Sequence, residues 1–279
     1  MSERRSEVQS RLATMNELDE VLGAMRGIAA ARIQQGERAR VAARQYAAGI
    51  GAALASLTVE VPPPAHRTDP VDLVVALCTD RGFVGALNER VLDGARATGG
   101  RTLVVVGSRG QALAQERAVP AVDGGGMTAH LGGLGDVADR VAGLLARRAD
   151  LAAGTLTAEV VYPRRAPSGG VEIERRRLLP IELDTLPRNG AGPRFEPITM
   201  LPRQKLIAEV AGEYVHARLY EMAAESFAAA NAASLEVLQA AHTHLDQMLA
   251  ELRRTENILR QDEITAEVLE VITGRMRDG

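Results

Sequence analysis

The sequence predicts an α/β fold in which the N- and C-terminal helices form a long antiparallel coiled coil and the centre forms a Rossmann-like α/β domain. All twelve prolines lie between Pro62 and Pro202. Because proline inside a helix costs about 3 kcal/mol, the two proline-free flanks are free to form long helices. Between them, β-type and α-type segments alternate, which is typical of a mostly parallel sheet covered by helices. The expected domains are an N-terminal coiled-coil helix, the α/β domain and a C-terminal coiled-coil helix, over residues 1–61, 71–186 and 203–279.

Both flanks repeat apolar residues every seven positions, which indicates the seam between two packed helices. In the N-terminal flank the expected seam residues are Val8, Met15, Leu22 and Ala29, with Leu18 and Met25 between them. In the C-terminal flank they are Leu238, Leu245, Leu252 and Leu259, interleaved with Ala241 and Met248. At about 1.5 Å per residue, the helices would measure roughly 80 and 100 Å, too long for burial in a compact domain. We therefore expect them to pack on each other and project.

The alternative for the flanks is a set of shorter helices in an ordinary bundle. Glycine weakens a helix interior, and five glycines support this alternative: Gly23, Gly27, Gly36, Gly49 and Gly51. Gly23 and Gly27 could instead allow two backbones to approach closely.

The central segment supplies the predicted sheet. Three apolar runs are expected to form strands, at residues 71–78, 101–107 and 156–163. The intervening helices are expected at residues 86–98, 109–117 and 135–149. A further run at 171–183 follows the third strand too closely for a crossover helix, so we expect it to pair antiparallel as an edge. The glycine-rich residues 123–135 are predicted to form a mobile loop.

Composition argues against several classes of protein. The net charge is −3 and aromatic residues make up only 3% of the chain, which argues against nucleic-acid binding. Cys78 is the single cysteine, so no internal disulfide is expected, in keeping with a reducing compartment. No apolar run approaches the roughly 20 residues that span a bilayer, and the start has no signal-peptide core. We therefore expect a soluble chain, which could still dock onto a membrane complex.

The stretch "TDRGFVGALN" at residues 79–88 lies between a predicted strand and a predicted helix, where nucleotide-binding loops occur. It lacks the three glycines of the dinucleotide fingerprint and the lysine of a phosphate-binding loop. The second strand ends without the acidic residue that would bind a ribose, although Arg109 could meet the 2′-phosphate of NADP. The favoured interpretation is a structural turn shaped by Gly82 and Gly85. Hydrogen bonds from three further residues would fix it: Asp80, Arg81 and Asn88.

No catalytic, cofactor-binding or metal-binding residue is predicted. His242 and His244 are two apart, so on a helix they point to different faces and are not expected to share a metal. Cys78 ends an apolar strand, where a buried, inert thiol is expected. The other histidines have no ligand-spaced partner in the sequence: His66, His130 and His216.

Three segments resemble motifs of the F-type ATP synthase γ subunit, in the same order. The C-terminal "NILRQDEITAEVLEVITGRM" at residues 257–276 resembles the most diagnostic motif of that family. "GAMRGIAAAR" at 23–32 is similar to the family's K-A-M-x-M-V-A-A-S-K, and "TDRGFVGALN" is similar to its S/T-D-R-G-L-C-G-x-x-N. The resemblance thus spans the chain.

The resemblance implies a central rotor shaft that couples ion flow through a membrane ring to ATP synthesis or hydrolysis, with no catalysis or cofactor of its own. The implied partners are the α and β subunits, the ε subunit and the c-ring, at the cytoplasmic face of the cell membrane; the chain would associate with the membrane only through the complex. The residues implied to meet β are Met25, Arg26, Arg260, Gln261, Thr265 and Glu267. The glycine turn would shape the base and contact neighbouring subunits without holding phosphate.

Some positions depart from the family pattern, including Ser234 in place of an arginine and His242 and His244 in place of threonine and asparagine. Gly27 and Val84 replace a methionine and a cysteine. These departures suggest a divergent branch, for which we hypothesise the alternate (N-type) bacterial F-ATPase. Two rival functions stay open at this stage: a nucleotide-dependent α/β enzyme with a coiled-coil arm, and a coiled-coil scaffold unrelated to energy conversion.

Overall fold

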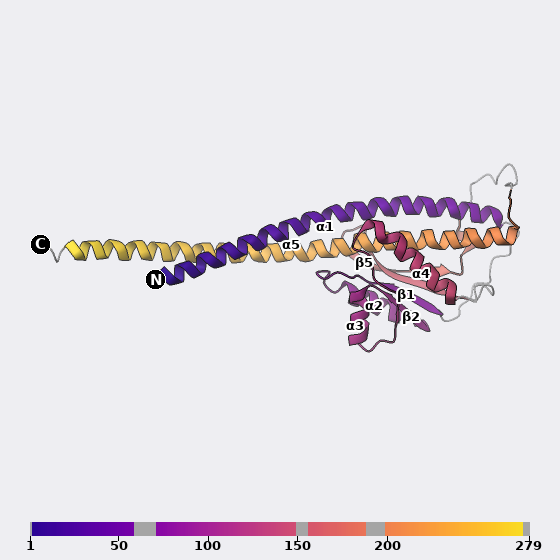
Figure 1. Ribbon diagram of the computed structural model, residues 1–279, viewed down its shortest axis with the longest axis horizontal. Helices are drawn as coiled ribbons and strands as arrows, with labels where there is room; N and C mark the ends of the chain where they lie inside the picture. Colours follow the sequence, from indigo (N-terminus) through magenta and orange to yellow (C-terminus); the bar gives the residue numbers. More distant parts are fainter. Residues whose placement is uncertain (1, 59–70, 149–155, 188–198, 276–279) are drawn as a thin grey trace. The chain divides into compact units, whose positions relative to one another are not determined.

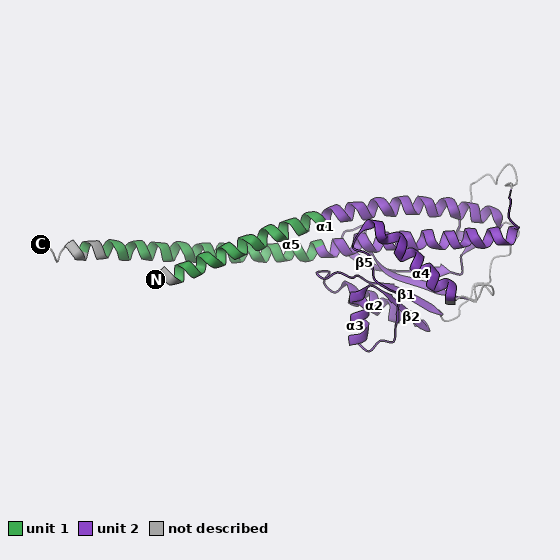
Figure 2. Cartoon of the chain, in the orientation of Figure 1, with its two compact units in different colours: residues 1–29, 235–279 green, residues 30–234 purple. Residues whose placement is uncertain are grey.

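The structure is a computed structural model that describes residues 2–58, 71–148, 156–187 and 199–275. The chain divides into two compact units: unit 1 comprises residues 1–29 and 235–279, and unit 2 comprises residues 30–234 (Figure 2). The predicted joint at 61–70 lies outside the described residues, as do most of the joint at 187–202 and the last four residues of the chain. The predicted domain boundaries follow breaks in the sequence rather than contacts, and they stay a prediction.

The two flanks form single long helices, α1 (Ser2–Leu57) and α5 (Arg203–Arg275), each of which contributes residues to both units (Figures 1 and 2). The prediction of two long helices is confirmed, and the alternative of several shorter helices is wrong. Within unit 2, Arg203 donates a hydrogen bond to the carbonyl oxygen of Leu57 at 3.1 Å. This contact satisfies a carbonyl at the end of α1, where no following turn supplies an amide to donate to it.

In unit 1 the helices pair antiparallel. Arg5 of α1 lies 2.6 Å from Glu263 of α5, and Gln9 donates a hydrogen bond to Glu256 at 3.0 Å. As the residue number increases along α1, the number of its partner on α5 therefore decreases. The apolar seam of unit 1 is formed by Val8, Leu12, Met15 and Leu22 of α1 with Leu245, Leu249 and Leu252 of α5.

The residues predicted at every seventh position of the seam are partly or fully buried, as are Met25 and Met248 between them, but the predictions for Leu18 and Ala241 are wrong. Leu18 was expected in the seam but is 46% exposed, whereas Asp19 is partly buried and pairs with α5. On α5, Ala241 is exposed, and His242 takes the corresponding place. At these two places the seam position falls one residue later than predicted, because Asp19 and His242 are polar and a search for apolar residues passes over them.

Unit 2 contains a five-stranded sheet in the order β3-β2-β1-β4-β5. The strands are β1 (Leu73–Leu77), β2 (Thr102–Val106), β3 (Val122–Asp123), β4 (Ala158–Arg165) and β5 (Val171–Leu179). All neighbouring pairs are parallel except β4 with β5, so the predicted antiparallel edge is confirmed. The short β3 was not predicted, because it lies at the start of the glycine-rich segment.

Helices cover both faces of this sheet, as the Rossmann-like prediction requires. They are α2 (Leu87–Ala97), α3 (Ser108–Glu116), α4 (Leu134–Arg148) and part of α5, with one-turn helices η1 (Leu131–Gly133) and η3 (Leu183–Thr185). Strand residues alternate between the two faces. Val75 and Leu77 face α4 and α5, whereas Val74 and Ala76 face α2 and α3.

The part of α5 in unit 2 is buried over much of its surface, which the coiled-coil prediction did not anticipate. Leu219, Met222 and Phe227 belong to the sheet core. On its other side α5 meets α1 closely, because a Cβ placed on Gly36 would lie 2.9 Å from the Cβ of Ala228. Within the described residues, no helix is long and apolar enough to cross a membrane.

Candidate partner-contact regions

The C-terminal part of α5 in unit 1 carries four of the predicted contact residues. The side chains of Arg260, Gln261, Thr265 and Glu267 are all exposed. The Thr265 hydroxyl donates to the carbonyl oxygen of Gln261 at 2.8 Å, so its own helix already takes up that donor. Among these four residues, the two charged groups and the Gln261 amide are therefore the groups that can donate to or pair with a partner.

Exposed apolar residues surround these polar ones, and the sequence reading did not single them out as a surface. They are Ile258, Ile264, Val268, Leu269 and Ile272, with exposed fractions between 47% and 60%. The Arg5–Glu263 pair lies almost at the start of α1. Residues of α5 beyond Glu263 thus have only the first turn of α1 to cover them. Their position outside the seven-residue repeat is the sequence signal that could have identified them.

Met25 and Arg26, the other two predicted contact residues, are partly buried on α1. The structure does not bring them together with the α5 group, because Arg5 marks the level of Glu263 and Met25 lies twenty residues further along the helix. At about 1.5 Å per residue this is roughly 30 Å. Unit 1 therefore holds two candidate contact levels rather than one combined site.

The predicted turn at residues 79–88 follows β1 in unit 2 and is fixed by its own side chains. The Thr79 amide donates to Asn88 Oδ1 at 2.9 Å, and Asn88 Nδ2 donates to the Thr79 hydroxyl at 3.2 Å. Gly85 has a φ of +56° and Phe83 one of +57°. A left-handed φ is costly for a side chain such as that of Phe83, so the surrounding bonds must hold it in place.

Polar contacts hold this turn against α5. Arg81 donates to Asn231 Oδ1 at 2.7 Å, and the Ser234 hydroxyl donates to the Phe83 carbonyl at 3.0 Å. Burial, together with nearby Arg32, lowers the pKa of Arg81. Arg81 was expected to fix the turn by hydrogen bonding; its side chain joins the turn to the long helix, and Ser234 adds a second bond there.

Asp80 also acts outside its own turn. Its carboxylate accepts a hydrogen bond at 2.6 Å from the amide of Ser108, the first residue of α3. A helix N-terminus is the usual place for a bound phosphate, because its amides are unpaired and its dipole favours negative charge. Here a carboxylate of the chain itself takes that place, which supports the structural interpretation of the turn.

Close backbone packing fills the adjoining space between β1 and β2. A Cβ on Gly107 would lie 2.7 Å from the carbonyl carbon of Cys78, and one on Gly110 would lie 2.3 Å from the Cys78 Cβ. Cys78 is fully buried, and burial raises the pKa of its thiol to about 12. A neutral, enclosed thiol is a poor nucleophile, so these residues act in packing.

Sequence reasoning missed a group of ion pairs with buried carboxylates, within the sheet edge and between this edge and α5. Glu159 of β4 is 3% exposed and lies 2.9 Å from Arg175 of β5. Glu221 of α5 is 2% exposed and lies between Arg218 and Arg176. Burial raises the pKa of Glu221, and the two arginines oppose that rise. The run of consecutive arginines in the edge strand was the available signal.

Comparison with known proteins agrees with this architecture. Residues 4–276 match the ATP synthase family. The chain is 28% identical to the ATP synthase gamma chain of Acidothermus cellulolyticus, over 95% of this chain and 93% of that one. It is 24% identical to the ATP synthase gamma chain of Rhodospirillum rubrum, over 96% and 97% of the two chains.

Solved structures resemble the fold at low sequence identity. A chain of the Euglena gracilis mitochondrial ATP synthase, in a structure of OSCP, F1 and c-ring, aligns with a TM-score of 0.59 at 13% identity, covering 99% of this chain and 95% of that one. A chain of the Tetrahymena thermophila central stalk and c-ring aligns at 0.57 and 14%, covering 79% and 99%.

A long antiparallel helix pair combined with a Rossmann-like sheet is thus the fold that this chain shares with chains of solved ATP synthase structures. The chain belongs to the ATP synthase family, as an F-type gamma subunit. Its role is that of the central shaft.

Proposed function

We propose that the chain transmits torque between a membrane ring and an α3β3 hexamer and catalyses no reaction by itself. Unit 1 would lie in the pore of the hexamer, and unit 2 would contact the ring and the ε subunit. The chain would thereby couple ion flow to ATP synthesis or hydrolysis in β, at the cytoplasmic face of the cell membrane.

The observation that carries this proposal is the exposed apolar surface near the end of α5. Ile264 and Val268 are 50% and 51% exposed, and exposed apolar groups that recur along one helix favour burial against a partner. A smooth apolar sleeve would surround such a helix without fixing it at one angle, since apolar contacts are not directional. The surface therefore fits a bearing in which the shaft turns.

The exposed polar residues would transmit force at defined heights. We propose that Arg260, Gln261 and Glu267 contact β near the end of α5, and that Met25 and Arg26 contact it at the second level. Ion pairs in water contribute about 0–1 kcal/mol when exposed. Contacts of that strength can form and break at each step, whereas a buried pair would hold the shaft at one angle.

The experiment places one charge on the proposed bearing. Val268→Asp puts a carboxylate where the sleeve would exclude water, and an unpaired charge in apolar surroundings costs several kcal/mol. We expect assembled enzyme carrying this change to lose most of its ATP-driven ion pumping. Val41→Asp is the matched control, because Val41 is also an exposed valine on a long helix, 46% exposed, but lies in unit 2. Equal pumping by the two variants would contradict the proposal.

The rival enzyme function predicts a different result. Calorimetry of the isolated chain with ATP and with NADP should give no saturable binding if the turn at residues 79–88 is structural. Micromolar binding of either nucleotide would favour an enzyme.

The order of the neighbouring genes tests the separate hypothesis of an N-type complex.

A further inference from the structure

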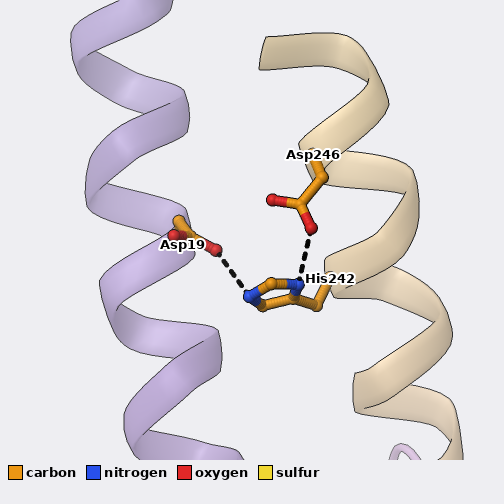
Figure 3. Close-up of side chains that lie close together, drawn as sticks. All are labelled: Asp19, His242 and Asp246. Carbon is orange, nitrogen blue, oxygen red and sulfur yellow. Dashed lines mark ion pairs between the residues drawn. The ribbon is translucent and has the colours of Figure 1, made fainter. Parts of the chain in front are cut away.

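Two polar residues in the seam of unit 1, together with an exposed residue beside it, form a cluster of potential metal ligands. Asp19 projects from α1, and His242 and Asp246 project from α5, one turn apart (Figure 3). The Nε2 atom of His242 lies 3.2 Å from Asp19 Oδ1, and its Nδ1 atom lies 3.1 Å from Asp246 Oδ2. The imidazole thus stands between two carboxylates that come from different helices.

A neutral imidazole cannot satisfy both carboxylates. It carries one N–H and one lone pair. If Nδ1 bears the proton and faces Asp246, the Nε2 lone pair faces an oxygen that is also negatively charged. Asp19 Oδ1 is shielded from solvent and, although it lies beside Nε2, accepts no hydrogen bond, and a shielded carboxylate oxygen without a hydrogen bond is costly. A positive charge beside Nε2 and Oδ1 would remove this conflict.

The spacing fits two ligands of one divalent transition metal. Zinc binds imidazole nitrogen and carboxylate oxygen at about 2.0–2.2 Å, so two such ligands at tetrahedral or right angles lie about 2.9–3.5 Å apart. The observed 3.2 Å falls in this interval. In such a pair both lone pairs point to the metal rather than to each other, which agrees with a close contact that lacks hydrogen-bond geometry.

Asp246 is placed to support the ligand rather than to bind the metal. A metal-binding histidine commonly directs its other ring nitrogen to a carboxylate, which fixes the tautomer and the orientation of the ring. Asp246 lies on that side of His242, one helical turn further along (Figure 3). We infer that Asp19 and His242 bind a divalent transition metal such as Zn²⁺ across the helix pair of unit 1, with Asp246 orienting the histidine and water completing the coordination.

The metal would join α1 to α5 in the seam. Leu22 and Leu245 belong to the apolar cluster of the same seam, so the polar cluster interrupts an otherwise apolar line. Coordination from both helices opposes their sliding or separation, because either movement would break a metal–ligand bond. The site would thus stabilise the pairing of the helices at a level where apolar contacts are missing.

The test uses the full chain, stripped of metal with EDTA and titrated with ZnCl₂ in a calorimeter. We expect one saturable site per chain, and a higher unfolding temperature with zinc that EDTA reverses. His242→Ala and Asp19→Asn should abolish that site. Asp246→Asn should keep it but weaken it by about 10–100-fold, the usual effect of losing a supporting partner.

His244→Ala is the matched control, since His244 is exposed on the same helix two residues away and is absent from the cluster. This variant should bind zinc like the native chain. Circular dichroism on every variant separates loss of binding from loss of helix.

Two results would overturn the inference: no saturable zinc binding by the native chain, or binding that survives both His242→Ala and Asp19→Asn. The first would mean that a protonated imidazole alone bridges the carboxylates. Because the readout is metal binding by the isolated chain, its failure leaves the shaft role untouched, and a failed pumping experiment leaves the metal site untouched.

Discussion

Unit 1 and unit 2 contain parts of the same two helices but depend on different kinds of packing. In unit 1 the buried side chains form a single line between two helices, represented by Leu12, Leu245 and Leu249. In unit 2 the α5 helix is buried against a sheet, and Met222 and Phe227 belong to a core that extends to Val75 and Val104. A helix pair can therefore change from a narrow seam to a full core along its length, and substitutions should cost more in unit 2.

The largest effect is expected for Gly110→Ala in unit 2. The added methyl group would lie 2.3 Å from the Cys78 Cβ and 2.5 Å from its sulfur, in a fully buried place. Overpacking of this kind typically costs about 1–3 kcal/mol and sometimes more. Urea unfolding followed by circular dichroism should show a large loss of stability.

Gly143→Ala is the control for that substitution. Gly143 lies inside α4, where an added Cβ would meet only the end of Arg147 at 3.8 Å. Alanine is a better helix former than glycine by about 0.8–1.0 kcal/mol, so this variant should gain stability. Equal losses for the two variants would show that the packing around Cys78 is looser than described.

A smaller effect is expected in the seam of unit 1. Leu245→Ala removes a side chain that is 6% exposed, and the cost should be about 2 kcal/mol, because a two-helix seam can partly collapse around the gap. Leu18→Ala should cost less than about 0.5 kcal/mol, since that leucine is 46% exposed. Hydrogen exchange at amides of unit 1 measures the loss of stability in both variants. If Leu18→Ala lost more protection than Leu245→Ala, the result would instead support the seam register that the apolar repeat alone predicts.

The smallest effect concerns the buried carboxylate of Glu221. Burial raises its pKa above that of the unfolded chain, so the stabilising contribution is complete below the unfolded value of about 4.3 and is lost as the pH rises through the folded pKa. Relative to Glu221→Gln, the native chain should therefore become less stable from pH 4 to pH 7. Urea unfolding at both pH values measures the difference; a relative gain by the native chain would mean that the ion pairs with arginine outweigh burial.

The long helices and most of the strands were predictable, because the types of residue in each segment are enough to indicate them. The absence of proline from both flanks predicted α1 and α5, and apolar runs predicted four of the five strands. The antiparallel edge followed from a connection too short for a crossover. The short strand β3 was missed, because only two residues pair there and the glycines that follow them suggested a loop.

The seam and the glycine turn show why other details were not predictable. Asp19 and His242 occupy seam positions that a search for apolar residues passes over, so the register between the sevenfold repeats was displaced. Asp80 and Arg81 form bonds with α3 and α5, elements that lie beyond their own turn. Residues that pair across long sequence separations depend on the fold itself, which no local pattern contains.

Antiparallel pairing of α1 with α5 underlies both proposals, and spin labels can test it in the full chain. Gln9 and Glu256, whose side chains lie 3.0 Å apart, would each be replaced by cysteine and labelled, while buried Cys78 stays unlabelled. We predict strong dipolar broadening for this pair. It should be absent for Gln9 with Gln239, seventeen residues away along α5 and thus about 25 Å distant. No broadening for Gln9 with Glu256, or equal broadening for both pairs, would contradict the pairing of the two helices.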